Sequence, residues 1–273
     1  MAGEATMKLV HLTDPRLSGP NRAGSEQCPI ESFRTTLAHI ERHHPDAVLG
    51  ILSGEALRTG RPAAASGLQR LIDASPIPWT RISGGSGQTD ALPQHPVTVP
   101  DTDGRCPSNQ IDSPIGRFLV PDMLGGDAAH ERWLPWLQEA LATAETDGRD
   151  VFLILQQPPF DPQLYSSDRQ GARKREQLLQ ALDRAPLRLR HLFIGPFHRP
   201  INGSWRGLGF SALPGRNQTL RLALATGRTS MDSQPTGSPE PQPYGVIVIE
   251  PAQPVSSLFR SRNSRTGSAP SPV

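Results

Sequence analysis

The stretch Lys8-Leu9-Val10-His11-Leu12-Thr13-Asp14-Pro15-Arg16 decides the fold of this chain, because it joins an apolar strand directly to a carboxylate. In α/β enzymes, functional side chains gather at the carboxyl ends of strands, and Asp14 occupies the position typical of a metal ligand. Two residues further on, where a second ligand such as His would be expected, stands Arg16. A guanidinium stays protonated and cannot ligate a metal. The stretch therefore predicts a metalloenzyme-like scaffold that lacks part of its metal chemistry.

Strand-like and helix-like segments alternate along the chain, as is typical of α/β proteins. Short apolar runs predict strands over residues 8–13, 47–52, 79–82, 151–155 and 191–194. Apolar residues at helical spacing predict helices that begin at Pro29 and that cover residues 63–74, 128–144 and 176–182. Shorter strands are expected after Ser204, including 219–225 and 244–250. This order predicts a parallel α/β core completed by antiparallel strands.

The composition favours a globular protein without a membrane or nucleic-acid partner. The chain has 273 residues and a formal charge of +2, which is too small to predict binding to nucleic acid or to a lipid surface. No apolar run has the length of a membrane span, and residues 1–6 do not combine a basic segment with an apolar one. Cys28 and Cys106 form no redox or metal-binding motif. We therefore expect a cytoplasmic protein.

A single domain is expected over residues 1–259, followed by a tail. Residues 260–273 alternate Arg, Ser and Pro with almost no apolar side chains, which predicts disorder. Within the domain, Arg173-Lys174-Arg175 predicts a solvated, charged helix face. Trp205, beside Arg206, is the best aromatic candidate for a pocket wall, and packing along an edge strand explains it equally well.

Five short motifs follow one another along the chain, each at the end of an expected strand. They are Asp14-Pro15-Arg16, Gly54-Glu55, Gly84-Gly85-Ser86-Gly87, Gln156-Gln157-Pro158-Pro159 and Gly195-Pro196-Phe197-His198. Their order resembles the D-x-H, G-D, G-N-H-D, H-H-P-P and G-H-x-H motifs of the calcineurin-like metallophosphoesterases, and among these the class III cyclic-nucleotide phosphodiesterases of bacteria. Residues 199–207 are similar to the segment that follows G-H-x-H in that branch. The resemblance implies a four-layer α-β-β-α sandwich.

The resemblance also implies a site for two metal ions that share a carboxylate and activate a hydroxide for attack on phosphate. The first metal position corresponds to Asp14, Arg16, Glu55 and His198. Asp14 and His198 match the family pattern, and Glu55 keeps the carboxylate on a longer side chain. Arg16 does not match.

The second metal position corresponds to Glu55, Gly85, one of Gln156 or Gln157, and Pro196. Only Glu55, which both positions share, is a strong ligand for Fe, Mn or Zn. The resemblance therefore implies that the second metal position is lost.

Arg16 and Ser86 both count against the family reaction. A guanidinium about 5 Å from a divalent cation, at an effective dielectric of about 20, is repelled by roughly 6–7 kcal/mol. The simpler expectation is that the guanidinium replaces the ion and pairs with Asp14 and Glu55. Ser86 stands where the family has the His of G-N-H-D, and a serine is no general acid at neutral pH. We expect no cofactor or, in a reduced site, one Mn, Fe or Zn ion at Asp14, Glu55 and His198.

Several of these residues also have simpler explanations, which the sequence leaves open. Asp14 can cap a turn or neutralise Arg16, and His198 can be a hydrogen-bonded histidine without a metal. The loop Gly84-Gly85-Ser86-Gly87 can cradle a phosphate with its backbone amides, or be a relaxed former metal loop.

Two functions of different classes are compatible with these motifs. The first, which we favour, is a pseudoenzyme with a binding or regulatory role. Its partner would be an anionic small molecule, held by Arg16, Arg199 and the glycine-loop amides, or an active paralogous protein. The second is an active phosphodiesterase with one metal ion at Asp14, Glu55 and His198. A purely structural subunit is a third possibility.

Overall fold

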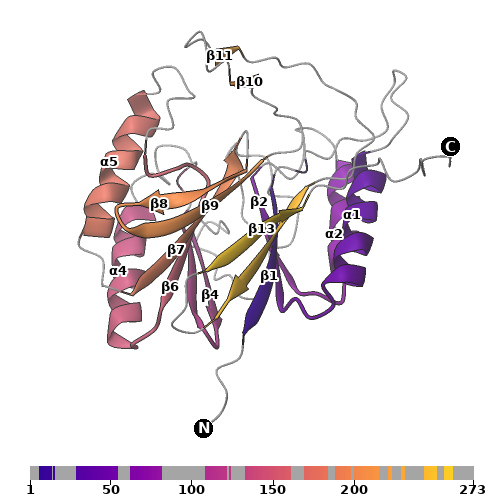
Figure 1. The fold of residues 1–273 in the computed structure, drawn as a ribbon, viewed down its shortest axis with the longest axis horizontal. Coiled ribbons are helices and arrows are strands. Elements are labelled where there is room, and N and C mark those ends of the chain that lie inside the picture. Colours follow the sequence, from indigo (N-terminus) through magenta and orange to yellow (C-terminus); the bar gives the residue numbers. More distant parts are fainter. Residues whose placement is uncertain are drawn as a thin grey trace, which may run out of the picture.

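Figure 1 shows four layers in the computed structural model of the chain, with two β-sheets between two pairs of helices. Helices α1 (Pro29–His43) and α2 (Pro62–Asp73) cover one side, and α4 (Trp133–Thr146) and α5 (Arg169–Asp183) cover the other. The predicted α-β-β-α sandwich is confirmed. The structure describes residues 6–13, 15, 29–54, 62–81, 108–121, 123, 133–160, 169–183, 188–197, 200–214, 221–222, 229–230, 243–250 and 255–260.

The first sheet has the strand order β13-β12-β1-β2-β3. Its parallel part consists of β1 (Met7–Thr13), β2 (Leu49–Ser53) and β3 (Trp79–Arg81). On the other side of β1, the antiparallel strands β12 (Tyr244–Ile249) and β13 (Ser256–Arg260) complete the sheet. The carboxyl ends of β1 and β2 therefore lie side by side, because Thr13 is in register with Ser53.

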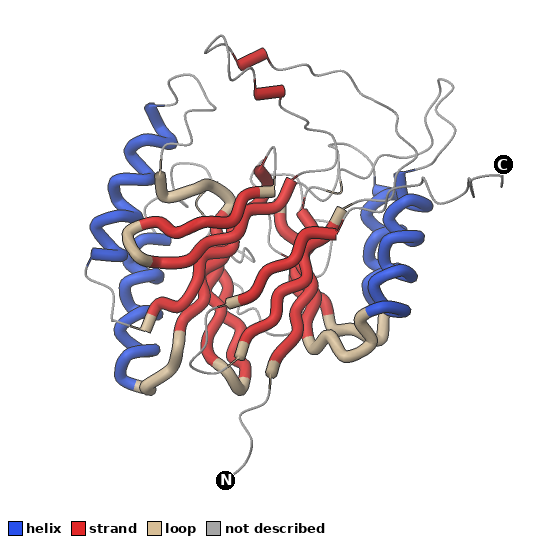
Figure 2. The backbone as a smooth tube through the Cα atoms, viewed as in Figure 1, coloured by secondary structure: helices blue, strands red, loops and turns tan. Residues whose placement is uncertain are grey.

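The second sheet has the strand order β4-β5-β6-β7-β9-β8. Its parallel strands are β5 (Gly116–Pro121), β6 (Val151–Leu155), β7 (Leu189–Phe197) and β9 (Leu208–Pro214). The edges are the antiparallel strands β4 (Ser108–Ser113) and β8 (Ile201–Trp205). A separate pair is formed by β10 (Arg221–Leu222) and β11 (Thr229–Ser230), drawn above the sheets in Figure 2.

Three apolar cores hold the layers together. One joins α1 and α2 to the first sheet, where Phe33, Leu37 and Ile40 present the predicted apolar face of α1. A second joins α4 and α5 to the second sheet and includes Trp133 and Leu178. No helix in the described ranges is both long and apolar enough to cross a membrane.

The third core lies between the two sheets and contains a row of phenylalanines. Phe118, Phe152 and Phe193 come from β5, β6 and β7, and their rings stack with centroids 4.9 Å apart for the first pair and 6.5 Å for Phe152 and Phe193. Leu9 and Ile51 of the first sheet belong to the same cluster. The sheets thus pack through large, fully buried side chains, which fix how their strand ends face each other.

The predicted core elements are confirmed by β1, β2, β3, β6, β7, α1, α2, α4 and α5. The later strands are confirmed by β10 within 219–225 and by β12 within 244–250. The strand β13 ends at Arg260, the first residue of the predicted tail. Residues 261–273 lie outside the described part, so the domain boundary and the disordered tail stay predictions.

The hairpin of β4 and β5 was not predicted, since β4 carries a weak apolar pattern. In β4, Ile111 is the one apolar residue. Hydrogen bonds of Arg117 hold the hairpin: its Nε donates to Asp112 of β4 at 2.7 Å, and its Nη2 donates to Asp147, beyond the end of α4, at 3.1 Å. The Arg117 hydrogen bond is the main reason that the pKa of Asp112 lies below its usual value.

The prediction that Arg173-Lys174-Arg175 forms a solvated face is wrong for its middle residue. Lys174 is 7% exposed, and its Nζ donates a hydrogen bond of 2.6 Å to the carbonyl oxygen of Met123. Successive helical residues are rotated by about 100°, so one residue of the run turns inward. The buried lysine thus ties α5 to the segment that follows β5.

We expect Phe152→Ala to lower the free energy of unfolding by about 3–5 kcal/mol, because it removes the central ring of the inter-sheet stack and leaves a cavity. Urea unfolding followed by circular dichroism measures the change. The control Val48→Ala shortens a side chain that is 49% exposed and should shift the free energy by less than about 0.5 kcal/mol. Equal effects of the two substitutions would contradict this packing.

Candidate functional site

The candidate site is the edge where the carboxyl ends of β1, β2 and β7 meet across the two sheets. The contact is direct at Gly195: a Cβ atom at this position would lie 2.9 Å from Thr13 Oγ1 and 3.0 Å from Ser53 Oγ. Such distances leave no room for a side chain. Thr13 and Ser53 end β1 and β2, so the segments that follow all three strands leave from one place. These segments begin the motifs at Asp14, Gly54 and Pro196.

A buried histidine lies directly below this contact. His11 Nε2 and Ser53 Oγ are 2.7 Å apart and share a hydrogen bond, and both residues are 1% exposed. Burial lowers the pKa of His11 to about 3, because the charged imidazolium would be removed from water. His11 is therefore neutral at physiological pH. The pair resembles a nucleophile and its base, yet it is closed to substrate, so its role is to pack and orient the strand ends.

Two predicted site residues follow β6. Gln156 is buried at 4% exposure, and Gln157 is the next residue along the chain. The side-chain oxygen of Gln157 is buried and accepts no hydrogen bond from any residue that the structure describes. An unsatisfied buried acceptor costs about 1–3 kcal/mol, and a donor or a cation at this point would recover that cost.

Pro196 lies in β7, at a point where the pairing with β9 is irregular. The register shifts between Ile194 and Phe197. Proline has no N–H to donate to a sheet ladder and is typical of such irregular positions. The other predicted site residues lie outside the described part of the chain: Asp14, Arg16, Glu55, Gly85, Ser86 and His198. Their roles stay predictions.

Sequence reasoning missed Lys174 as a charged group near this edge. Its hydrogen-bond acceptor, Met123, follows β5, while Gln157 follows β6, and these two strands are parallel neighbours. The buried ammonium therefore lies toward the same end of the sheet as the motif residues. A single lysine between two arginines carries no sequence signal that distinguishes it from a surface charge.

The described part of the edge does not match the donor set of a two-metal centre. Thr13, Ser53, Gln156 and Gln157 present hydroxyl and amide groups, whereas Fe, Mn and Zn sites use carboxylates and imidazoles. Within the described ranges, no group of three His, Cys, Asp or Glu side chains is arranged to hold a metal. The candidate ligands Asp14, Glu55 and His198 are not among the residues tested by this observation.

The chain is similar in sequence to a probable cyclic nucleotide phosphodiesterase of Rhodopseudomonas palustris. The two are 28% identical over 252 residues, which covers 89% of each chain. No family model matches the chain.

Two solved structures share the fold. A purple acid phosphatase from yellow lupin (Lupinus luteus) seeds superposes with a TM-score of 0.60 at 11% identity, over 94% of this chain and 52% of that protein. A putative 5'-nucleotidase from Staphylococcus aureus superposes with a TM-score of 0.53 at 12% identity, over 97% of this chain and 56% of that protein. The chain thus spans about half the length of these two structures.

We expect Gly195→Ala to destabilise the protein by about 1–3 kcal/mol, because the new methyl group meets two buried hydroxyl side chains that have no space to withdraw. Chemical unfolding measures the loss. A substitution without effect would show that the two sheets do not touch at this edge.

Acid should weaken the fold through its buried histidines. The pKa of His11 is lowered to about 3 and that of His191, which bonds Ser211 Oγ, to about 4, both by burial. In the unfolded chain these groups titrate near pH 6.5, so between that pH and their folded pKa values the unfolded state binds more protons. Stability is therefore full above pH 6.5 and falls as the pH drops, by about 1.4 kcal/mol per pH unit for each histidine.

The test compares wild type with His11→Gln, which keeps a hydrogen-bonding side chain but does not titrate. Urea unfolding at several pH values between 7 and 4 measures the free energy of unfolding. In the variant this free energy should fall less steeply with decreasing pH, by about 1.4 kcal/mol per pH unit. Identical slopes in the two proteins would mean that His11 is not kept neutral by the fold.

Proposed function

We propose that the chain is a pseudoenzyme of the calcineurin-like metallophosphoesterase superfamily that uses the carboxyl edge of its sheets to bind an anionic ligand. Its fold and its similarity to a probable cyclic nucleotide phosphodiesterase support the family. The proposal adds that the two-metal hydrolytic reaction has been lost.

The residue types at the metal-ligand positions of the motifs support this proposal. Pro196 occupies a position where the family motif has a metal-binding His, and its ring nitrogen is part of the backbone and cannot ligate. Gln156 and Gln157 provide only amides where the motif has His. Arg16 stands in the other metal position of the motifs, and its charge repels a cation. Replacement of neutral or anionic ligands by a guanidinium changes the preferred occupant from a cation to an anion.

A cyclic nucleotide is the anionic ligand that the similar protein suggests. In this proposal the guanidinium of Arg16 pairs with the phosphate, and Arg199 adds a second charge-assisted contact. The amides of the loop Gly84-Gly85-Ser86-Gly87 complete the cradle. Ser86 gives the leaving group no general acid, so the ligand is bound and not cleaved. An active paralogous protein is the alternative partner of such a pseudoenzyme.

A second candidate function is a phosphoesterase with one metal ion. Asp14, Glu55 and His198 would be its ligands, two carboxylates and one imidazole. The buried, unsatisfied oxygen of Gln157 favours this candidate, since an amide oxygen can complete the coordination of a hard divalent ion.

Cyclic AMP should bind in the presence of a chelator if the first proposal is correct. Calorimetric titration of the full chain in EDTA would compare wild type with Arg16→Ala. We expect the substitution to weaken binding at least tenfold, which corresponds to about 1.4 kcal/mol. As control, Arg34→Ala removes an exposed arginine of α1 that pairs with Glu31, and it should leave the affinity unchanged. No binding by wild type, or equal binding by Arg16→Ala, would contradict the proposal.

Hydrolysis of a chromogenic phosphodiester distinguishes the two candidates. With Mn, Fe or Zn added separately, the pseudoenzyme predicts no turnover above that of His198→Ala. Metal-dependent turnover that disappears in His198→Ala would instead establish the single-metal enzyme.

A further inference from the structure

A recess lies on the outer face of the second sheet, between α5 and the hairpin of β8 and β9. Its volume is about 460 Å³, and it is lined by Pro159, Phe160, Arg175, Glu176, Leu179, Trp205 and Arg206. The turn of this hairpin follows Trp205, at the amino end of β9. There, Gly209 of β9 is in register with His191, which lies near the amino end of β7. The recess therefore involves the opposite end of β7 from Gly195. Pro159 and Phe160 close it from the segment after β6.

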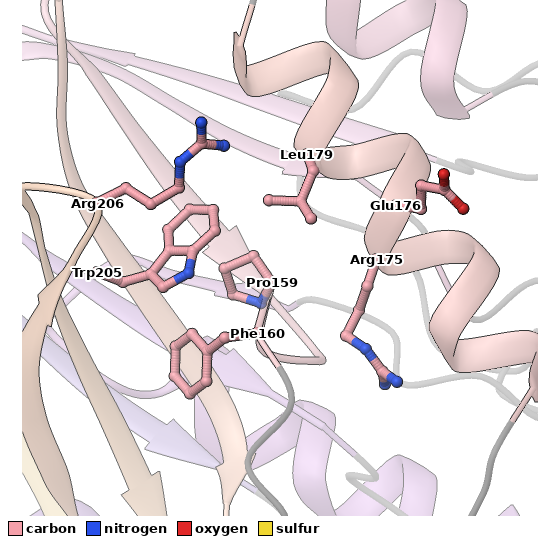
Figure 3. Close-up of a pocket in the computed structure, with 7 residues that line it drawn as sticks. All are labelled: Pro159, Phe160, Arg175, Glu176, Leu179, Trp205 and Arg206. Carbon is pink, nitrogen blue, oxygen red and sulfur yellow. The ribbon is translucent and has the colours of Figure 1, made fainter.

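One wall of the recess is flat and aromatic. Figure 3 shows the Trp205 ring beside Pro159 and above Phe160, facing Leu179 on α5. The Trp205 and Phe160 centroids are 6.3 Å apart, and Phe160 packs in turn on Phe210 at 4.9 Å. Trp205 and Phe160 pack against the apolar core that joins α4 and α5 to the second sheet. The sequence alternatives for Trp205 are thus both met: it ends an edge strand and it lines a pocket. Two apolar walls on opposite sides suit a flat ring.

Guanidinium groups lie at the rim of this aromatic slot. The Arg206 guanidinium lies 5.7 Å from the centre of the Trp205 ring and forms an ion pair of 2.6 Å with Asp183 at the end of α5. Arg175 comes from α5 on the other side, and Figure 3 shows the Glu176 carboxylate turned away from the Trp205 wall. An anion at this rim would take the place of Asp183 as the partner of the Arg206 guanidinium.

The backbone at Arg206 is unusual and places this guanidinium over the ring. Its φ is 54°, and Gly207 follows with a φ of 81°, so both central residues of the hairpin turn are left-handed. Such turns favour Gly, Asn or Asp, so an arginine at this position is unusual. An arginine held there against its backbone preference is the kind of local strain that accompanies binding sites.

We propose that this recess binds a planar aromatic compound that carries an anionic group, such as a nucleotide or an aromatic carboxylate. The ring lies against Trp205, and the Arg206 guanidinium pairs with the anion. Stacking on an aromatic side chain and one charge-assisted hydrogen bond hold the ligand, and the two contacts together give a moderate affinity. This site is separate from the one at Gly195 and does not depend on the function proposed there.

The chain offers a matched pair of variants for the test. Arg206→Gly removes the guanidinium and relieves the left-handed backbone, so the hairpin should keep its fold. Asp183→Asn removes the ion pair between the hairpin and α5 but keeps the guanidinium. A binding role of Arg206 predicts loss of affinity in the first variant and retained or tighter binding in the second. A purely structural role predicts the same result in both.

The probes are AMP and anthranilate, titrated calorimetrically into the full chain. Adenosine, which lacks the anion, and inorganic phosphate, which lacks the ring, are the comparison compounds. We expect at least one of the two probes to bind, with an affinity at least tenfold lower in Arg206→Gly and in Trp205→Leu. Whichever probe binds identifies a nucleotide or an aromatic acid as the ligand type. Arg34→Ala, which removes an exposed arginine of α1 outside the recess, should leave this affinity unchanged. A loss in Arg206→Gly and Trp205→Leu but not in Arg34→Ala assigns the binding to the recess.

The proposal is overturned if neither AMP nor anthranilate binds at millimolar concentration. It is also overturned if Arg206→Gly binds as wild type does, or if adenosine or phosphate alone binds as tightly as the probes. Thermal unfolding of Trp205→Leu verifies that its loss of binding does not reflect loss of fold.

Discussion

The close approach of Gly195 to Thr13 and Ser53 is the constraint on which the functional edge depends. The two sheets are held apart by large side chains, including the Phe118, Phe152 and Phe193 row, over most of their facing surfaces. At Gly195 the backbone of β7 instead meets two small hydroxyl side chains directly. The chain segments after β1, β2 and β7 therefore begin within a few ångströms of one another, although they are far apart in sequence. Any side chain at position 195 would separate them.

The electrostatic character of this edge follows from what is buried beneath and beside it. His11 is kept neutral by burial, so it adds no positive charge below the motif residues. Lys174 brings an ammonium toward the same end of the second sheet and binds a carbonyl oxygen there. The described residues at the edge contribute amides and hydroxyls without a carboxylate.

The core of the fold could be predicted from the sequence, because strands buried on both faces are continuous apolar runs. Val151–Leu155 was predicted to the residue for this reason. The hairpin of β4 and β5 could not, since Ile111 is the one apolar residue of β4 and Arg117 holds the hairpin through Asp112 of β4 and through Asp147, beyond the end of α4. The inward turn of Lys174 depends on helix rotation and on Met123, fifty-one residues away along the chain. At the site, residue types predicted which ligands of the family motifs are replaced, while the contact at Gly195 required the structure.

Direct measurement of bound metal tests the central claim, that this edge no longer supports a two-metal centre. The protein would be purified without chelator, and Mn, Fe and Zn would be quantified per chain by mass spectrometry. We predict a total well below one ion per chain. Two tightly bound ions per chain would contradict the claim, because they would require strong ligands that replace the missing histidines.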